Sequence, residues 1–304
     1  YIYYIRKKNF NICIPIYNES QNLEELISDL NKFVEIDNTS HTYNIVFYDD
    51  GSTDNTLNIL KKYKKITVLE GKENMGLGHA IKSLIEHSLD QKVDGIFKID
   101  GDNQMKVREI NNFLRSDFFE DSDVIYGNRF NSKLQYSMPK MRKLGSTFFR
   151  YLLKIFSINV SDPTNGFIYL SKRYINNYKI IGAYNAAQQI LLDAKLRNLV
   201  INEIDITVDS RSVGMSFIGI KYPVIVISNM IALLAYRKTV RYLISPGLIS
   251  LFSGTVLLII NIVNWLLGKK ETVISDNILI LLIIVGIQLS IMGFLLEIYK
   301  NQKN

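Results

Sequence analysis

Three short polar segments carry residue types suited to metal-dependent phosphate chemistry. They are residues 15–19, 48–54 and 100–104. In the third, Asp100 and Asp102 follow an apolar run, and Gln104 extends the same spacing to another oxygen donor. Magnesium and manganese prefer oxygen ligands, commonly one or two carboxylates together with substrate phosphates, and such an ion stabilises charge on a leaving group. The spacing therefore predicts a Mg2+ or Mn2+ site at Asp100, Asp102 and Gln104.

Each segment alone also has an ordinary structural explanation. Asp49 and Asp50 followed by Gly51 and Ser52 are typical of a turn that leads into a helix cap, and Asp100-Gly-Asp suits a solvated turn. All three segments, however, follow runs that are predicted to be strands of one sheet. Ligands of open α/β sheets gather at the carboxyl ends of the strands. The shared position favours one ligand site over three unrelated turns.

The elements that must position these segments alternate between short β-like runs and amphipathic helical stretches. Such alternation implies parallel βαβ units with right-handed crossovers. The predicted fold is α/β, with a Rossmann-like, mostly parallel sheet flanked by helices. Strands are expected at residues 10–17, 43–48, 66–69, 95–99, 123–126, 167–170 and 204–208. Helices are expected at residues 20–34, 53–63, 77–89, 107–114, 140–156 and 188–199.

Two stretches near the C-terminus, residues 248–267 and 278–296, contain no charged side chain. A helix of about 20 apolar residues crosses a hydrocarbon core of roughly 30 Å. Two buried core helices are the alternative, which this length without charge disfavours. Residues 268–277 are polar and suit the turn between two spans. The pattern predicts a C-terminal two-helix transmembrane hairpin.

The distribution of positive charge predicts how the hairpin is oriented. The chain has a net charge of +7. Basic residues flank both outer ends of the hairpin, although Lys269 and Lys270 lie in its turn; those at the outer ends are Lys221, Arg237, Lys238, Arg241, Lys300 and Lys303. Cytoplasmic flanks of membrane spans carry an excess of Lys and Arg. We therefore expect a multi-pass protein of the inner, or cytoplasmic, membrane with its catalytic domain in the cytoplasm.

The predicted domains follow from these boundaries. Residues 1–217 would form the catalytic domain, and residues 218–245 juxtamembrane interfacial helices. Residues 246–298 would hold the two spans, and residues 299–304 a cytoplasmic tail.

Composition disfavours two other classes of protein. The one cysteine, Cys13, excludes a disulfide framework within the chain and lies in an apolar run typical of a core. Basic residues do not form a stripe interleaved with aromatic residues, so a nucleic-acid partner is not expected.

In their order and spacing, the three polar segments resemble family 2 glycosyltransferases of the GT-A fold. Four later motifs resemble a narrower group, the dolichyl-phosphate mannose synthases and bacterial polyprenyl-phosphate glycosyltransferases. They occupy residues 127–130, 142–146, 162–167 and 211–216. The similarity covers about residues 10–217, and a two-span hairpin also occurs in the bacterial members.

The resemblance implies a role for each matching residue. Contacts to the base and ribose of a nucleotide are expected from Pro15, Tyr17, Glu19 and Asp49, with Asp50 nearby. Asp100, Asp102 and Gln104 would hold the metal on the diphosphate. The phosphate of a lipid acceptor would be bound by Arg129, Arg142 and Ser146, and Arg211 would lie on a loop that closes over the donor.

The sequence does not fix the role of two glycine-containing segments. Gly78, in the turn before a predicted helix, would cradle a phosphate or serve only as part of the turn. The Asn165-Gly166 pair predicts an unusual backbone angle.

The function that the resemblance implies is metal-dependent, inverting transfer of a sugar from UDP- or GDP-hexose to polyprenyl (undecaprenyl) phosphate. A phosphate acceptor needs no general base, because its second ionisation, at about pH 6, already makes it anionic. A glycan hydroxyl acceptor would need one, and the nearest candidates are Asp162 and Asp193. A non-catalytic membrane protein that binds nucleotide-sugar or acts as a scaffold is the third possibility. A homo-oligomer is also left open.

Overall fold

The computed structural model describes residues 7–37, 41–130, 140–183, 186–208, 222–268 and 275–303, with the backbone alone at 37, 140–142, 222 and 303. The chain divides into two compact units, residues 1–230 and 231–304. The first unit is built on a seven-stranded sheet. The second contains two long apolar helices.

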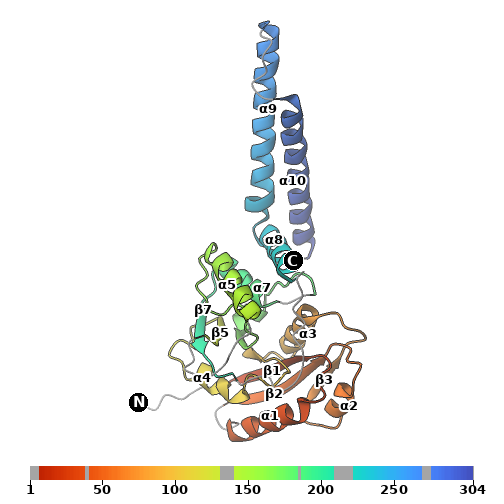
Figure 1. Cartoon of the computed structure of the whole chain (residues 1–304), viewed down its shortest axis with the longest axis vertical. Coiled ribbons are helices and arrows are strands. Elements are labelled where there is room, and N and C mark those ends of the chain that lie inside the picture. Colours follow the sequence, from red (N-terminus) through yellow and green to blue (C-terminus); the bar gives the residue numbers. More distant parts are fainter. Residues whose placement is uncertain are drawn as a thin grey trace. The chain divides into compact units, whose positions relative to one another are not determined.

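The sheet has the strand order β3-β2-β1-β4-β6-β5-β7 (Figure 1). Its strands are β1 (Asn9–Ile16), β2 (Thr42–Asp49), β3 (Thr67–Glu70), β4 (Gly95–Lys98), β5 (Val124–Asn128), β6 (Ile168–Ser171) and β7 (Ile201–Asp205). β1 pairs in parallel with β2 and β4, β2 with β3, and β5 with β7. β6 runs antiparallel to β4 and to β5, so β5 has the same direction as β4. The carboxyl ends of β1, β2, β4 and β5 therefore share one edge with the amino end of β6.

Helices cover both faces of the sheet, with α1 (Leu23–Asp37) below it and α3 (Leu77–Asp90) above it in Figure 1. The apolar side of α1 is buried at Leu23, Leu26, Ile27 and Leu30, the spacing of one helical face. It packs with the apolar side chains of β1 in a single core cluster. The remaining helices of this unit are α2 (Thr56–Leu60), η1 (Val107–Glu109), α4 (Ile110–Leu114), α5 (Lys140–Lys154), α6 (Lys172–Ile175) and α7 (Ala187–Leu196).

The sheet confirms the predicted α/β architecture and departs from the expected strands at two places. β6 is antiparallel, and an apolar run of four residues contains no information on strand direction. β7 begins at Ile201, earlier than the predicted residue 204. The prediction missed this start because Asn202 and Glu203 are polar and make that stretch of sequence unlike a strand. Both side chains are half-buried and form hydrogen bonds, Asn202 with Ser122 and Glu203 with backbone N–H groups.

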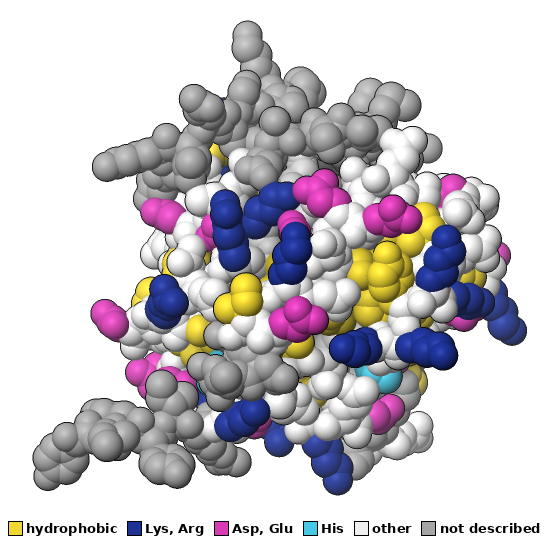
Figure 2. Space-filling model, turned by 90° about the horizontal axis from the view of Figure 1, so that it is seen from below, with side chains coloured by type: hydrophobic (Ala, Val, Ile, Leu, Met, Phe, Trp, Pro, Cys, Tyr) yellow, Lys and Arg dark blue, Asp and Glu magenta, His cyan; other side chains and the backbone are white. Residues whose placement is uncertain are grey.

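The outer surface of the first unit carries charges of both signs. In the view from below, Lys and Arg side chains are interspersed with Asp and Glu side chains (Figure 2). Positive charge is therefore not concentrated on that face.

The C-terminal part contains α8 (Tyr222–Arg237), the π-helical segment η2 (Val240–Ile244), α9 (Ser245–Leu266) and α10 (Asp276–Lys303). Val240–Leu266 and Asp276–Gln302 are each long and apolar enough to cross a membrane. The helices approach closely, since a Cβ atom on Gly286 would lie 2.5 Å from the backbone nitrogen of Leu251. The Ser250 hydroxyl donates to the carbonyl of Leu282 at 2.8 Å. Together they fit the predicted hairpin.

Candidate active site

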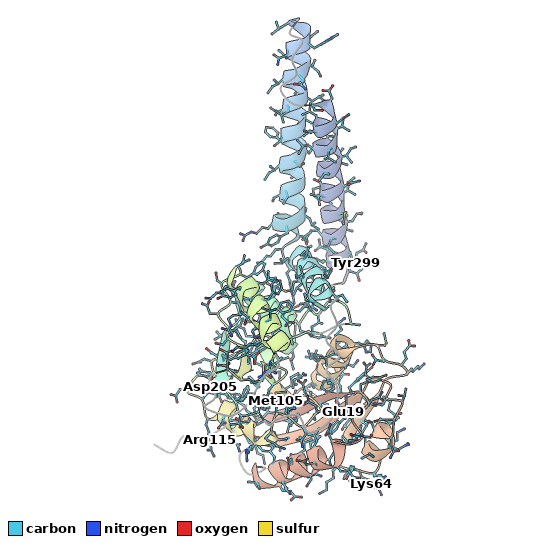
Figure 3. All side chains as sticks on the ribbon, in the orientation of Figure 1. Glu19, Lys64, Met105, Arg115, Asp205 and Tyr299 are labelled. Carbon is cyan, nitrogen blue, oxygen red and sulfur yellow. The ribbon has the colours of Figure 1, made fainter. Side chains whose placement is uncertain are left out.

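The loops that follow β1 and β2 are joined by hydrogen bonds at the carboxyl edge of the sheet. The Asn18 side-chain oxygen accepts from the backbone N–H of Thr53 at 2.8 Å, and the Asn18 N–H donates to Ser52 Oγ at 3.0 Å. Glu19, labelled in Figure 3, donates its backbone N–H to Thr56 Oγ1 at 3.0 Å. Asn18 adopts a positive φ of 53°, which asparagine tolerates better than most residues. Two of the three predicted segments thus form one surface.

Asp49 and Asp50 are both buried and hold backbone around this surface. Asp49 accepts from the hydroxyl of Ser52 and from its N–H at 3.2 Å. Asp50 accepts from the N–H groups of Met75 and Gly76, at 3.0 and 2.8 Å. These two bonds anchor the turn before α3, which sequence reasoning did not foresee.

The nucleotide roles of this surface remain predictions. Pro15 lies opposite Tyr48 in the β1–β2 register, and the Tyr17 side chain is partly exposed beyond the end of β1. The Gly78 N–H donates to the carbonyl of Ala183 at 2.8 Å. In this conformation the Gly78 N–H is therefore already hydrogen-bonded within the protein.

Asp100 and Asp102 follow β4 and lie beside the amino end of β6. The ammonium of Lys98, which is buried, forms an ion pair with Asp100. Gly166, just before β6, touches the same carboxylate so closely that a Cβ atom there would overlap it. Gly166 has no positive φ, so the expected unusual backbone angle is wrong. Close approach of Asp100 is the reason for glycine at this position.

The donor atoms of this loop fit a divalent cation that keeps substrate ligands. Gln104 is buried, and its N–H donates to Asp102 Oδ1 at 3.2 Å. The Oδ1 atom of Asn103 is buried without a hydrogen-bond partner. In the described part of the chain, no three His, Cys, Asp or Glu side chains gather as a ligand set. Two carboxylates with amide oxygens suit Mg2+ or Mn2+ bound partly by phosphates, rather than a closed protein cage.

Arg129, at the end of β5, belongs to a buried cluster around Asp162. Its Nε and Nη2 atoms donate to the two Asp162 carboxylate oxygens at 2.6 and 2.9 Å, the bidentate geometry that arginine favours. Ser146, on α5, donates its hydroxyl to Asp162 Oδ1 at 3.3 Å, and the Thr164 hydroxyl does so at 3.1 Å. The Asp162 carboxylate therefore holds both Arg129 and Ser146.

Glu203 holds this cluster from β7. Its carboxylate accepts from the backbone N–H groups of Ser161 and Asp162 at 2.9 Å. Sequence reasoning missed Glu203, because its partners lie about 40 positions earlier in the chain.

Residues 162–166 connect the Arg129 cluster to the Asp100 loop. Asp162 binds Arg129, whereas Gly166 touches Asp100. Four peptide units span at most about 14 Å. The predicted phosphate-binding arginine and the predicted metal loop therefore lie near each other at one edge of the sheet.

The sequence also matches a known protein family. Residues 11–179 match the family model described as Glycosyl transferase family 2. The chain belongs to glycosyltransferase family 2. This confirms the resemblance seen in the sequence, and the protein is an enzyme of the glycosyltransferase class.

Two relatives of this glycosyltransferase have names that describe enzymes acting on lipid phosphates. UDP-N-acetylglucosamine–dolichyl-phosphate N-acetylglucosaminyltransferase of Methanococcus voltae is 23% identical over 219 residues, which cover 64% of this chain and 83% of that protein. Dodecaprenyl-phosphate galacturonate synthase of Rhizobium johnstonii is 23% identical over 249 residues, which cover 80% of this chain and 70% of that protein.

A solved structure supports the predicted GT-A fold. Glucosyl-3-phosphoglycerate synthase of Mycobacterium tuberculosis, crystallised with Mn2+, uridine diphosphate and phosphoglyceric acid, superposes with a TM-score of 0.56. It is 15% identical, over 76% of this chain and 78% of that chain. At this identity the likeness concerns the fold alone.

Two predicted site residues of this glycosyltransferase cannot be described. The Arg142 side chain and all of Arg211 lie outside the described residues. Val208 forms an antiparallel bridge with Met105, labelled in Figure 3 just beyond the Asp100–Gln104 loop. The described chain before Arg211 thus ends beside the predicted metal loop.

Proposed function

We propose that this glycosyltransferase moves a sugar from UDP- or GDP-hexose to a polyprenyl phosphate on the cytoplasmic face of a membrane. The observation that carries the proposal is the 162–166 segment, which joins the carboxylate loop to the Arg129–Ser146 cluster. Such a site combines groups for a diphosphate with groups for a second phosphate. The relatives named for dolichyl and dodecaprenyl phosphate support the same acceptor class.

On the donor side, Asp100, Asp102 and Gln104 would hold Mg2+ or Mn2+ against the diphosphate. The bound cation would neutralise the charge that develops on the leaving nucleotide. Pro15, Tyr17, Glu19 and Asp49 would hold the base and ribose, and the joined loops after β1 and β2 keep their backbone fixed.

On the acceptor side, the helix that carries Ser146 exposes apolar side chains. Leu144, Phe148 and Tyr151 recur at the spacing of one helical face, and Ile155 follows directly after the helix ends. Tyr151 is 64% exposed. Phe149 and Leu153, on the other side, are buried. Ser146 is buried on the same side as Phe149 and Leu153, opposite the stripe. An exposed apolar stripe on the helix that also carries this proposed phosphate-binding serine supports an acceptor with a hydrocarbon chain.

The carboxylates considered as general bases support a phosphate acceptor over a glycan hydroxyl. Asp162 is fully buried and paired with Arg129. Asp193 is also fully buried, 3.6 Å from Arg197, and accepts from the N–H of Lys179. Neither is exposed to take a proton from a sugar. An anionic phosphate requires no such base, and a single displacement by it inverts the anomeric centre.

An acceptor panel tests the proposal. Full-length protein in detergent, given radiolabelled UDP- and GDP-sugars with Mn2+, should label undecaprenyl phosphate and leave undecaprenol and oligosaccharides unlabelled. Removing the metal with EDTA should abolish the product, and added Mn2+ or Mg2+ should restore it. Labelled oligosaccharide would support the glycan-hydroxyl alternative. Absence of product across all donors and acceptors would support a binding or scaffold protein.

A further inference from the structure

The helix α5 presents an exposed apolar stripe in the described part of the first unit. Leu144, Phe148 and Tyr151 form it, and Ile155 continues it directly after the helix ends. All four side chains are at least 45% exposed. The opposite side of the helix is buried, and α5 lies beside α7 (Figure 1). A contiguous exposed apolar patch marks a surface that binds protein or lipid.

Basic residues accompany this stripe. The sequence of α5 holds five Lys and Arg residues and no Asp or Glu. Lys143 and Lys154 are exposed and lie three helical turns apart, on one line along the helix. The Lys154 ammonium lies 5.9 Å from the centre of the Tyr151 ring, at the border of the stripe. An apolar stripe bordered by lysines is typical of a helix that lies in the plane of a membrane surface.

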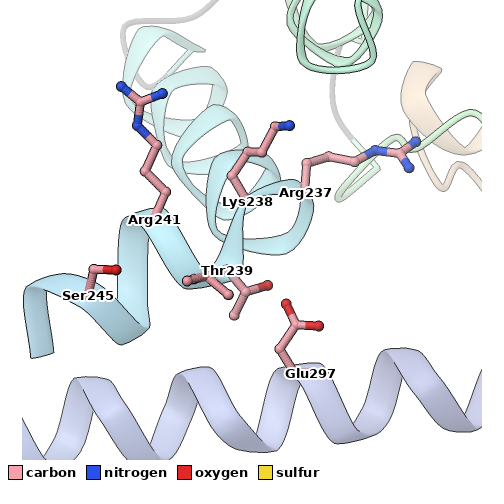
Figure 4. A pocket seen from close by; sticks show the side chains of 7 residues that line it. Arg237, Lys238, Thr239, Arg241, Ser245 and Glu297 are labelled. Carbon is pink, nitrogen blue, oxygen red and sulfur yellow. The ribbon is translucent and has the colours of Figure 1, made fainter. Parts of the chain in front are cut away.

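The basic segment between α8 and α9 is arranged differently. Arg237, Lys238 and Arg241 extend in different directions from the ribbon, while Glu297 lies on the neighbouring helix α10 (Figure 4). These basic side chains do not converge on one anionic group. Charge alone therefore does not indicate a lipid contact there, whereas α5 combines charge with an ordered apolar stripe.

A membrane fits α5 better than a second copy of the protein does. Two copies that met along their stripes would bring Lys143 and Lys154 of each close to those of the other, and like charges placed opposite each other destabilise an interface. Anionic head groups instead attract lysine, while the lysine stems stay against apolar surface. The same chain carries two helices that are apolar enough to span a membrane.

We propose that α5 lies in the head-group region of an anionic membrane, with its stripe against acyl chains and Lys143 and Lys154 at the phosphates. The inference rests on the membrane location in the proposed function, and it adds a second attachment to the membrane besides the hairpin. A polyprenyl chain lies in the same bilayer, so this contact is compatible with acceptor binding along the stripe. Docking in this way keeps Ser146 at the depth of a lipid phosphate.

Spin labels on single introduced cysteines test this contact. The full-length protein is placed in nanodiscs of phosphatidylglycerol and phosphatidylcholine, without donor or acceptor, and Cys13 is fully buried and should stay unlabelled. Labels at Leu144→Cys and Tyr151→Cys should be accessible to oxygen, which concentrates in the bilayer, and protected from a water-soluble nickel chelate. The matched control, Ile36→Cys at an exposed apolar position of α1, should show the reverse.

Substitution of the two lysines tests the charge. Lys143→Gln/Lys154→Gln should weaken docking by about fivefold for each lysine removed, measured as loss of nickel protection at Leu144→Cys. The control Lys62→Gln/Lys64→Gln removes the same charge from exposed positions of the first unit and should dock as the wild type does. Nanodiscs of phosphatidylcholine alone should weaken docking as the test variant does.

Three results would overturn the proposal. High nickel accessibility of both stripe labels would mean that α5 faces water, and low accessibility to oxygen and nickel alike would mean that protein covers the stripe. The third is equal docking of the wild type and Lys143→Gln/Lys154→Gln. Sugar transfer in detergent should be unchanged in that variant. Docking without any sugar transfer by the wild type would contradict the proposed reaction and leave this inference standing.

Discussion

At the scale of single residues, the site depends on contacts made by side chains and backbone from distant parts of the sequence. Asp162 binds Arg129, Ser146 and Thr164, and Gly166 leaves room for the Asp100 carboxylate. Residue types and spacing indicated Asp100, Asp102 and Arg129. They gave no indication of Lys98 or Glu203, because a lysine or glutamate in a strand has no motif and its partner is known only after folding.

Gly166→Ala should weaken cation binding with little effect on the rest of the fold. The added methyl group would overlap the Asp100 carboxylate and turn it away from the cation position. We expect the apparent affinity for Mn2+, measured by electron paramagnetic resonance with UDP present, to fall about tenfold, as when a residue that orients a metal ligand is changed. Gly145→Ala is the matched control, because a Cβ atom there meets nothing within 4 Å. Equal Mn2+ affinity in both variants would argue against Asp100 as a ligand.

At the scale of elements, strand direction decides which loops meet. Parallel β1, β2 and β4 followed from the alternation of strand and helix, so their loops could be brought together from sequence alone. The antiparallel direction of β6 could not, since Ile168–Ser171 would be equally apolar either way. That reversal brings residues 162–166 to the same edge. The connection between the proposed donor and acceptor groups therefore emerged only from the structure.

The exposed stripe of α5 gives a prediction at this scale. Phe148→Ser/Tyr151→Ser should raise KM for undecaprenyl phosphate about tenfold and leave KM for the nucleotide-sugar unchanged, because only the acceptor has a hydrocarbon chain to contact. A short-chain prenyl phosphate should show a smaller change. Ile36→Ser, at an exposed apolar position of α1, should behave as wild type. Equal KM changes for donor and acceptor would mean that the stripe does not bind the lipid.

At the scale of the whole molecule, the two C-terminal helices are long and apolar enough to hold the proposed reaction at a membrane. Length and lack of charge predicted both helices, whereas their close packing at Gly286 depends on three-dimensional contacts. The orientation across the membrane and the division at residues 217 and 245 remain predictions. The charge at the two outer ends favours a cytoplasmic location for both.

Labelling of introduced cysteines can test that orientation without interference from the protein's own cysteine. Cys13 is fully buried, and burial raises the pKa of its thiol to about 12, so it should not react with maleimide. In intact cells, a membrane-impermeant maleimide should label Ser275→Cys, in the hairpin turn. It should label Gln302→Cys only after permeabilisation. Labelling of both positions in intact cells, or of Gln302→Cys alone, would contradict the proposed topology.

In the proposed reaction, Asp100 and Asp102 hold the cation that stabilises the leaving nucleotide during transfer to a lipid phosphate. The most direct measurement is the rate of sugar transfer to undecaprenyl phosphate by Asp102→Asn in the full-length protein, beside Asp90→Asn at an exposed position. Loss of a group that stabilises transition-state charge costs about 100-fold or more. We predict that loss for Asp102→Asn, with unchanged folding, and wild-type rates for Asp90→Asn. Wild-type turnover by Asp102→Asn would contradict the account.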